Sequence, residues 1–90
     1  MRVAQAIETR LSEELRPERL EIEDESARHH GHAGARPEGE SHFRVTIVSA
    51  TFEGMSRLER QRLVYRLLAE EMKTDIHALS LTTRTPSEDI

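Results

Sequence analysis

The chain has 90 residues, a net charge of −4 and a hydrophobic fraction of 36%, which is enough for one small domain but too little for two separate cores. It contains no cysteine, and this excludes disulfides, thiol catalysis and any metal site built on its own thiolates. The acidic balance argues against general nucleic-acid binding, and because no membrane-length apolar run or signal-peptide pattern is present, we expect a cytoplasmic protein without membrane contact.

The first predicted element is an amphipathic helix. Its hydrophobic residues recur at every fourth position: Val3, Ile7, Leu11 and Leu15. Pro17 ends this pattern, because a helix seldom continues into the residue before a proline. Leu20 and Ile22 then alternate with acidic residues, which predicts a short strand.

Residues 26–41 form the next segment and favour neither helix nor strand. The segment is rich in glycine and contains three of the five histidines: His29, His30 and His32. A loop of this length in so small a domain is commonly functional or disordered. After it, Phe43, Val45 and Ile47 occupy alternate positions, so we predict a second strand that pairs with the first.

The second half of the chain predicts a helix and a third strand. Ser56 and Glu59 have the spacing of a capping box at a helix start. One side of that helix is hydrophobic: Leu63, Val64, Leu67, Leu68 and Met72. A third strand is predicted over Ile76–Thr82, and the tail from 83 to 90 should fray. The predicted order is α-β-β-α-β in a single domain, with a core of about residues 3–82.

Several short strings follow one another along the chain. The main ones are Asp24-Glu25-Ser26, Glu40-Ser41-His42-Phe43-Arg44-Val45, Phe52-Glu53-Gly54, Arg60-Gln61-Arg62-Leu63-Val64-Tyr65 and Ile76-His77-Ala78-Leu79-Ser80-Leu81. In order and spacing these strings resemble the BolA family. The resemblance runs from about Leu15 to Pro86, nearly the whole chain. It implies an α/β (α+β) domain with a class II KH-like fold, in which helices cover a three-stranded sheet and include a helix-turn-helix-like element.

The resemblance also implies a function, which is partnership with a monothiol glutaredoxin through a bridging 2Fe–2S cluster. In that arrangement the glutaredoxin and a bound glutathione provide thiolates. The BolA protein provides a histidine from the third-strand motif and a histidine or cysteine from the loop. The strand histidine corresponds to His77. Imidazole ligands raise the potential of such a cluster and couple its binding to protons.

Because the chain has no cysteine, the loop ligand implied by this resemblance must be a histidine. Counting forward from Ser26 points to His29, whereas counting back from the second strand points beside His32. We favour His29, then His32, then His30. The isolated chain, a monomer or weak dimer, is expected to hold no cluster of its own.

Each histidine also has a simpler explanation. By position alone, His77 could rest on the core at a strand end. The loop histidines could be solvated or bind a divalent metal adventitiously, and His42 is interpreted as structural. No nucleophile–base pair stands in a recognisable context, so we expect no enzyme, and Tyr65 is expected in the core.

A group of arginines on the second predicted helix gives the alternative function. Its members are Arg57, Arg60, Arg62 and Arg66. They could form a solvated face paired with Glu59 and Glu70, or they could contact DNA phosphates, as in the transcription-regulator role attributed to some BolA proteins. The Gly-x-x-Gly loop with which KH modules clamp a nucleic-acid backbone is absent, and this weakens the DNA interpretation.

Overall fold

The computed structural model describes residues 2–25 and 42–89. Its elements in chain order are α1 (Arg2–Leu15), β1 (Arg19–Asp24), β2 (His42–Val48), η2 (Ala50–Phe52), α2 (Arg57–Leu67), α3 (Ala69–Thr74), β3 (Ala78–Arg84) and η3 (Pro86–Glu88). The α-β-β-α-β order expected from sequence is confirmed. The predicted second helix is divided into α2 and α3, and two 3-10 turns are added, η2 before α2 and η3 after β3. None of the described helices is long and apolar enough to cross a membrane.

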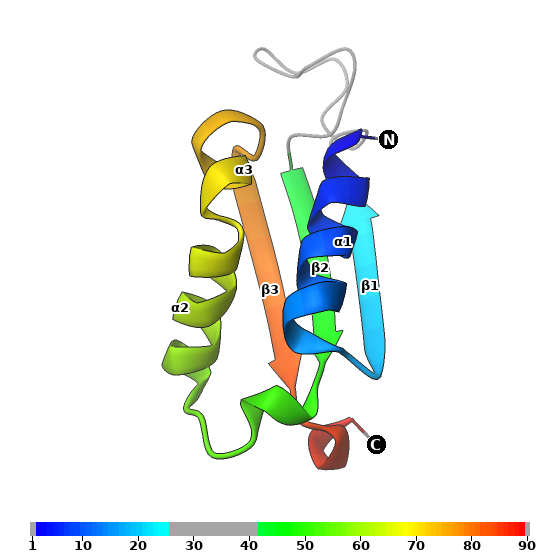
Figure 1. Ribbon diagram of the computed structural model, residues 1–90, viewed down its shortest axis with the longest axis vertical. Helices are drawn as coiled ribbons and strands as arrows, with labels where there is room; N and C mark the ends of the chain where they lie inside the picture. The colour runs from blue at the N-terminus through cyan, green and yellow to red at the C-terminus, as the bar shows by residue number, and fades with distance from the viewer. Residues whose placement is uncertain (1, 26–41, 90) are drawn as a thin grey trace.

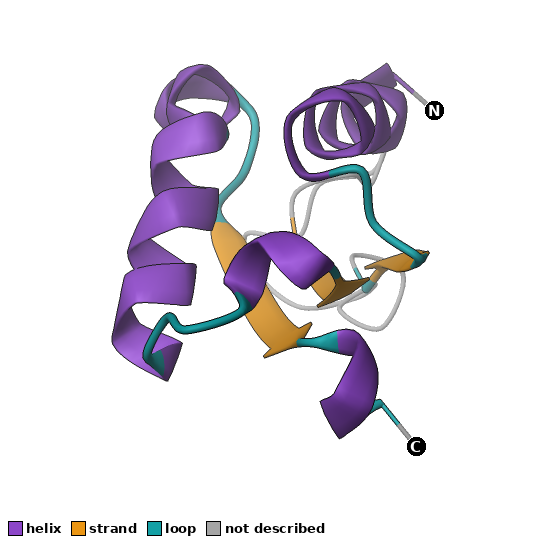
Figure 2. Ribbon diagram, turned by 60° about the horizontal axis from the view of Figure 1, so that its bottom comes forward, coloured by secondary structure: helices purple, strands orange, loops and turns teal. Residues whose placement is uncertain are grey.

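The three strands form one sheet in the order β1-β2-β3. The β1–β2 pair is antiparallel and the β2–β3 pair is parallel. The α-helices lie together over one face of this sheet (Figures 1 and 2). Because only β1 runs in the opposite direction, the end of β1 and the beginnings of β2 and β3 lie at the same end of the sheet. The residues that flank the segment 26–41 therefore lie at this end of the sheet.

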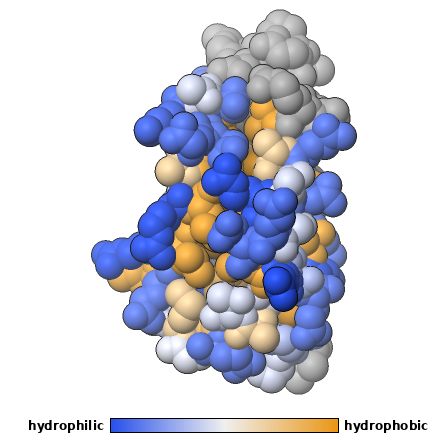
Figure 3. Space-filling model, in the orientation of Figure 1, coloured by the Kyte–Doolittle hydropathy of each residue, from blue (hydrophilic) through white to orange (hydrophobic). Residues whose placement is uncertain are grey.

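The core lies between the helices and the covered face of the sheet. The predicted stripe of α1 is confirmed, since its four members have at most 5% of their surface exposed. These residues pack with Phe43, Val45 and Ile47 of β2. Burial of aliphatic and aromatic surface of this kind is the main favourable contribution to folding. Hydrophobic surface remains visible between the helices in Figure 3, with hydrophilic side chains along both flanks.

The helix predicted as continuous from residue 57 is interrupted at Leu68. Its start is as expected, because Ser56 and Glu59 form the complete capping box. At the break, Leu68 has φ −101° and ψ 19° and is fully buried. The carbonyl of Leu67 accepts a hydrogen bond from Nη1 of Arg10 at 3.2 Å. A side chain of α1 therefore bonds a carbonyl at the end of α2, which is a recognised cause of helix interruption.

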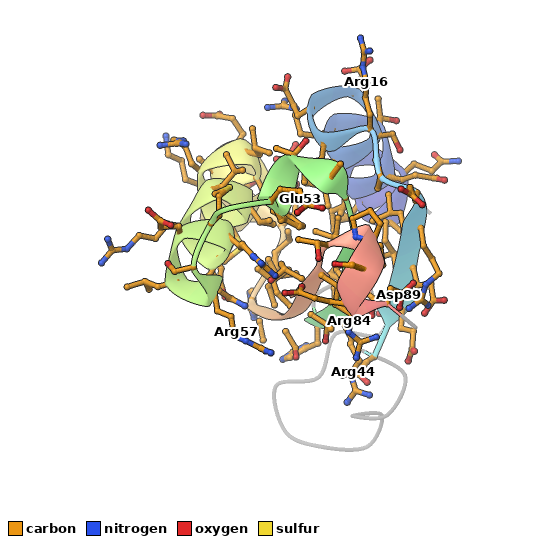
Figure 4. The ribbon with its side chains drawn as sticks, turned by 90° about the horizontal axis from the view of Figure 1, so that it is seen from below. Arg16, Arg44, Glu53, Arg57, Arg84 and Asp89 are labelled. Atoms are coloured by element: carbon orange, nitrogen blue, oxygen red, sulfur yellow. The ribbon has the colours of Figure 1, made fainter. Side chains whose placement is uncertain are left out.

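The C-terminal tail is folded, so the expectation of fraying is wrong. β3 extends to Arg84, and η3 begins with a capping box in which the N–H of Thr85 donates to Oε1 of Glu88 at 2.8 Å. Asp89 forms ion pairs with Arg19 at 2.7 Å and with Arg84 at 3.3 Å. Figure 4 shows Arg84 and Asp89 together at this end of the molecule. These contacts fasten the tail to both outer strands.

The stability that the C-terminal tail gives to the fold depends on pH through Glu88. Hydrogen bonds from Arg60 and from the Thr85 backbone lower the pKa of Glu88 from 4.5 to about 2. A carboxyl group with a depressed pKa stabilises the fold above its unfolded-state pKa, and this contribution is lost as the pH falls toward the folded-state value. The contribution is therefore complete above about pH 4.5 and disappears near pH 2.

We predict that Glu88→Gln lowers the thermal midpoint at pH 6 and that its difference from wild type shrinks between pH 4.5 and pH 2. Thermal unfolding across this range measures the difference. Glu53→Gln, at another exposed carboxylate, is the matched control and should show no such convergence. A wild-type advantage of the same size at pH 6 and pH 2 would contradict the assignment.

Candidate metal-ligand site at the loop end of the sheet

His77 is placed by the turn between α3 and β3. The backbone N–H of Ile76 donates to the carbonyl of Glu71 at 2.9 Å, and the Ile76 side chain is only 3% exposed. His77 follows this buried anchor and is exposed. The third strand begins at Ala78, two residues later than predicted, so His77 precedes the strand. The simpler interpretation, a histidine resting on the core, is therefore wrong.

His42 lies beside His77 and is the first residue of β2. The parallel register pairs His42 with Ala78, which brings the two imidazoles together. Their ring centroids are 6.2 Å apart, with the ring planes at 66°, an edge-to-face arrangement. The carbonyl of His42 accepts from the N–H of Glu25 at 2.7 Å, so the end of β1 is fixed against the same residue.

A shallow cavity of about 280 Å³ opens at this end of the sheet. Its lining residues come from all three strands or their ends: Glu25, His42, Phe43, Ala78, Leu79 and Ser80. Glu25 has 17% of its side chain exposed and pairs with Arg44 at 3.3 Å. The site therefore combines imidazole, carboxylate and hydroxyl groups beside a hydrophobic wall. His77 does not line the cavity, but it directly precedes Ala78, which does.

The three loop candidates, His29, His30 and His32, lie outside the described residues, so their relative order stays a prediction. Both ends of their segment, Glu25 and His42, line the cavity. Sequence reasoning gave His42 little weight because its closeness to His77 depends on strand register. One signal could have given this register from the sequence. Phe43 in β2 and Leu79 in β3 are both hydrophobic residues that face the core, and pairing them aligns the two strands.

The arginine group on α2 is not a single solvated face. Arg57, Arg62 and Arg66 are exposed, but Arg60 retains only 7% of its surface. The guanidinium of Arg60 donates to the carbonyls of Met55 at 3.0 Å and Thr83 at 3.3 Å, and it pairs with Glu88 at 2.8 Å. Arg60 also lies 5.8 Å from the ring centroid of Phe52. Its assignment to a solvated or DNA-contacting face is therefore wrong.

The acidic partners expected for these arginines are also engaged elsewhere. Glu59 accepts from the backbone N–H of Ser56 at 2.7 Å in the capping box. Glu70 pairs with Lys73 at 3.5 Å. Tyr65, expected in the core, is 38% exposed, and its hydroxyl donates to the carbonyl of Leu79 at 3.2 Å.

Comparison with known proteins identifies the family. The chain matches the BolA-like protein family over residues 11–88. It belongs to this family. Protein BOLA1, chloroplastic, of Arabidopsis thaliana is 52% identical over 87 residues, which are 94% of this chain and 54% of that protein. This BolA-like chain thus spans about half the length of its plant relative.

Two further comparisons bear on fold and function. The solved structure of BolA1 from Arabidopsis thaliana matches with a TM-score of 0.86 and 49% identity, covering 97% of this chain and 95% of that one. The BolA-type α+β fold expected from the sequence is therefore confirmed. A relative from Haemophilus influenzae named DNA-binding transcriptional regulator BolA is 42% identical over 88 residues, covering 98% of this chain and 82% of that protein.

Proposed function

We propose that this BolA-like protein is an adaptor without enzymatic activity, which binds a monothiol glutaredoxin and shares a 2Fe–2S cluster with it in iron–sulphur trafficking or iron regulation. His77 provides one ligand and a histidine of the 26–41 segment provides another, while the glutaredoxin and its glutathione provide thiolates. The observation that carries the proposal is an exposed His77 at the end of the sheet where that segment begins and ends.

The chemistry of the donor groups fits this cargo. Neutral imidazole is a suitable ligand for iron, and replacing thiolate by imidazole reduces the negative charge of the cluster and raises its potential. An imidazole that becomes protonated can no longer bind metal. A cluster held in part by exposed His77 is therefore accessible to a second protein, and its binding is sensitive to protons.

Chain connectivity supports a loop histidine as the second ligand. His29 is four residues beyond Glu25, and an extended chain spans at most about 3.5 Å per residue, which limits His29 to roughly 14 Å from that anchor. His32 is three residues further along. His29 therefore has the shortest tether to Glu25 of the three candidates, which agrees with its first place in the ranking from the sequence but does not favour His32 over His30.

Mixing the protein with the monothiol glutaredoxin of its own organism under anaerobic conditions tests the proposal. We expect the reconstituted mixture to have a visible absorption and circular dichroism spectrum distinct from that of the glutaredoxin homodimer. Of the single variants His29→Ala, His30→Ala and His32→Ala, one should lose this spectrum, and the other two act as its controls. A triple variant that keeps the spectrum would contradict a loop ligand.

A second candidate function is DNA-binding regulation. Two observations favour it: the name of the Haemophilus influenzae relative, DNA-binding transcriptional regulator BolA, and the exposed arginines of α2, namely Arg57, Arg62 and Arg66. The net charge of −4 opposes it, because phosphate binding normally requires a basic surface.

For this candidate we predict that Arg62→Gln/Arg66→Gln weakens duplex DNA binding and reduces the slope of log affinity against log salt by about 2. Titration of labelled DNA at several salt concentrations measures both quantities. Arg44→Gln/Lys73→Gln removes the same charge from other exposed positions. Equal losses in both double variants would show that net charge, not the α2 surface, governs the binding.

A further inference from the structure

The two outer strands of the sheet differ in how their free backbone edges are covered. In β3, the carbonyls of Leu79 and Thr83 point away from β2. The hydroxyl of Tyr65 donates to the first at 3.2 Å, and the guanidinium of Arg60 donates to the second at 3.3 Å. Side chains of α2 thus occupy the β3 edge. Covering an edge in this way prevents another strand from adding to it.

The edge of β1 has no such cover in the described part of the chain. The N–H of Glu25 donates to the carbonyl of His42, and with the antiparallel register this directs the backbone groups of Leu20 and Ile22 away from β2. Among the described elements β1 pairs only with β2, and it forms the outer side of the sheet in Figure 1. An open edge is a template for strand addition.

The side chains along β1 divide into two rows. Glu21 and Glu23 are exposed, and Glu21 also pairs with Arg19 of the same strand. Leu20 and Ile22 are half-buried and pack against the core. Successive side chains of a strand point to opposite faces. An added strand would therefore meet carboxylates on the open face and aliphatic surface on the helix-covered face.

A second copy of this chain is a poor occupant of the edge. The antiparallel registers that use most of the strand place Glu21 opposite either Glu21 or Glu23 of the copy. The first of these also places Arg19 opposite Glu23, but Arg19 is already paired with Asp89 and Glu21 of its own chain. Like charges directly opposite each other destabilise strand pairing. The same carboxylates favour an added strand with basic side chains opposite Glu21 and Glu23. The charge pattern therefore favours a basic segment of another protein over a second copy of this chain.

We propose that the β1 edge is a docking surface for an extended basic segment of a partner protein. The segment adds as a fourth strand antiparallel to β1, with Lys or Arg side chains facing Glu21 and Glu23 and aliphatic side chains continuing the row of Leu20 and Ile22. The backbone groups of the aliphatic residues in the segment form the hydrogen bonds to β1. This surface is separate from the ligand role of His77, and its test does not depend on a cluster.

The probe is a labelled synthetic peptide of four Lys-Val repeats, acetylated and amidated, titrated into the full chain and followed by fluorescence anisotropy. Peptide binding should slow hydrogen exchange at the amides of Leu20 and Ile22. N-methylation of the valines, which removes the donors that face β1, should abolish binding. N-methylation of the lysines, whose N–H groups face away, should preserve it.

Charge-reversed proteins provide the second arm. Glu21→Lys/Glu23→Lys should bind the peptide roughly tenfold more weakly, as expected for two cross-strand ion pairs, while Glu13→Lys/Glu14→Lys, the same charge change on the exposed side of α1, should bind normally. Equal losses in both variants, or unchanged binding of the valine-methylated peptide, would show nonspecific charge attraction and overturn the proposal. Concentration-dependent protection of Leu20 and Ile22 without peptide would assign the edge to a second copy and also overturn it.

Discussion

Replacing His77 with alanine is expected to abolish the visible spectrum that distinguishes the mixed glutaredoxin complex from the glutaredoxin homodimer. His77 is exposed, directly follows the buried anchor Ile76 and precedes β3. It therefore presents its imidazole from a fixed backbone. Alanine removes an exposed imidazole together with its edge contact to His42, so the free energy of unfolding should change by no more than about 1 kcal/mol.

His42→Ala is the matched control for this prediction. The two rings are neighbours, with centroids 6.2 Å apart, so both substitutions remove an imidazole from the same region. We expect His42→Ala to retain the mixed-complex spectrum and His77→Ala to lose it. Loss in the His42 variant with retention in the His77 variant would move the ligand assignment to His42. If both variants retained the mixed-complex spectrum, neither histidine at this end of the sheet would be a cluster ligand.

The elements that the sequence predicted are those whose signals are local. The four-residue spacing from Val3 to Leu15 defines α1 without reference to the rest of the chain, because one helix face returns every three to four residues. The alternation around Phe43 and Val45 defines β2 in the same way. The capping box of Ser56 and Glu59 spans only one helical turn. Each pattern can be recognised within a short stretch of sequence, whichever distant residues it packs against in the fold.

The features that the sequence missed depend on contacts between distant residues. Arg60 has the polar character of an exposed helix position, but its partners Thr83 and Glu88 are 23 and 28 residues away. The helix break after Leu67 involves Arg10, 57 residues away. No periodicity in a short window contains such information. These contacts become predictable only when the relative position of α1, α2 and β3 is known.

The candidate site follows the same division. His77 was predictable from the residues around it and from the family resemblance they carry. The end of the sheet at which it lies follows from strand direction, since β2 and β3 are parallel. The proximity of His42 additionally requires the register of that pair, which a one-residue slip would change.

Replacement of Arg60 by methionine is expected to destabilise the fold by about 2–3 kcal/mol, the cost of leaving two bonded carbonyls without their charged donor. Those carbonyls belong to Met55 and Thr83, and methionine can fill much of the same volume without donating to either. Urea unfolding monitored by circular dichroism measures the loss. Arg62→Met, at an exposed position on the same helix, should change stability by no more than about 0.5 kcal/mol.

Arg60→Lys separates the geometry of the guanidinium from its charge. Lysine keeps the positive charge near Glu88, but its single ammonium lacks the planar fork with which arginine reaches several acceptors at once. In the structure, Arg60 uses Nε for Met55 and Nη1 for both Thr83 and Glu88. We therefore expect stability between that of wild type and that of Arg60→Met. A lysine variant as stable as wild type would mean that charge alone holds the C-terminal segment, and a methionine variant as stable as Arg62→Met would mean that the segment is held without Arg60.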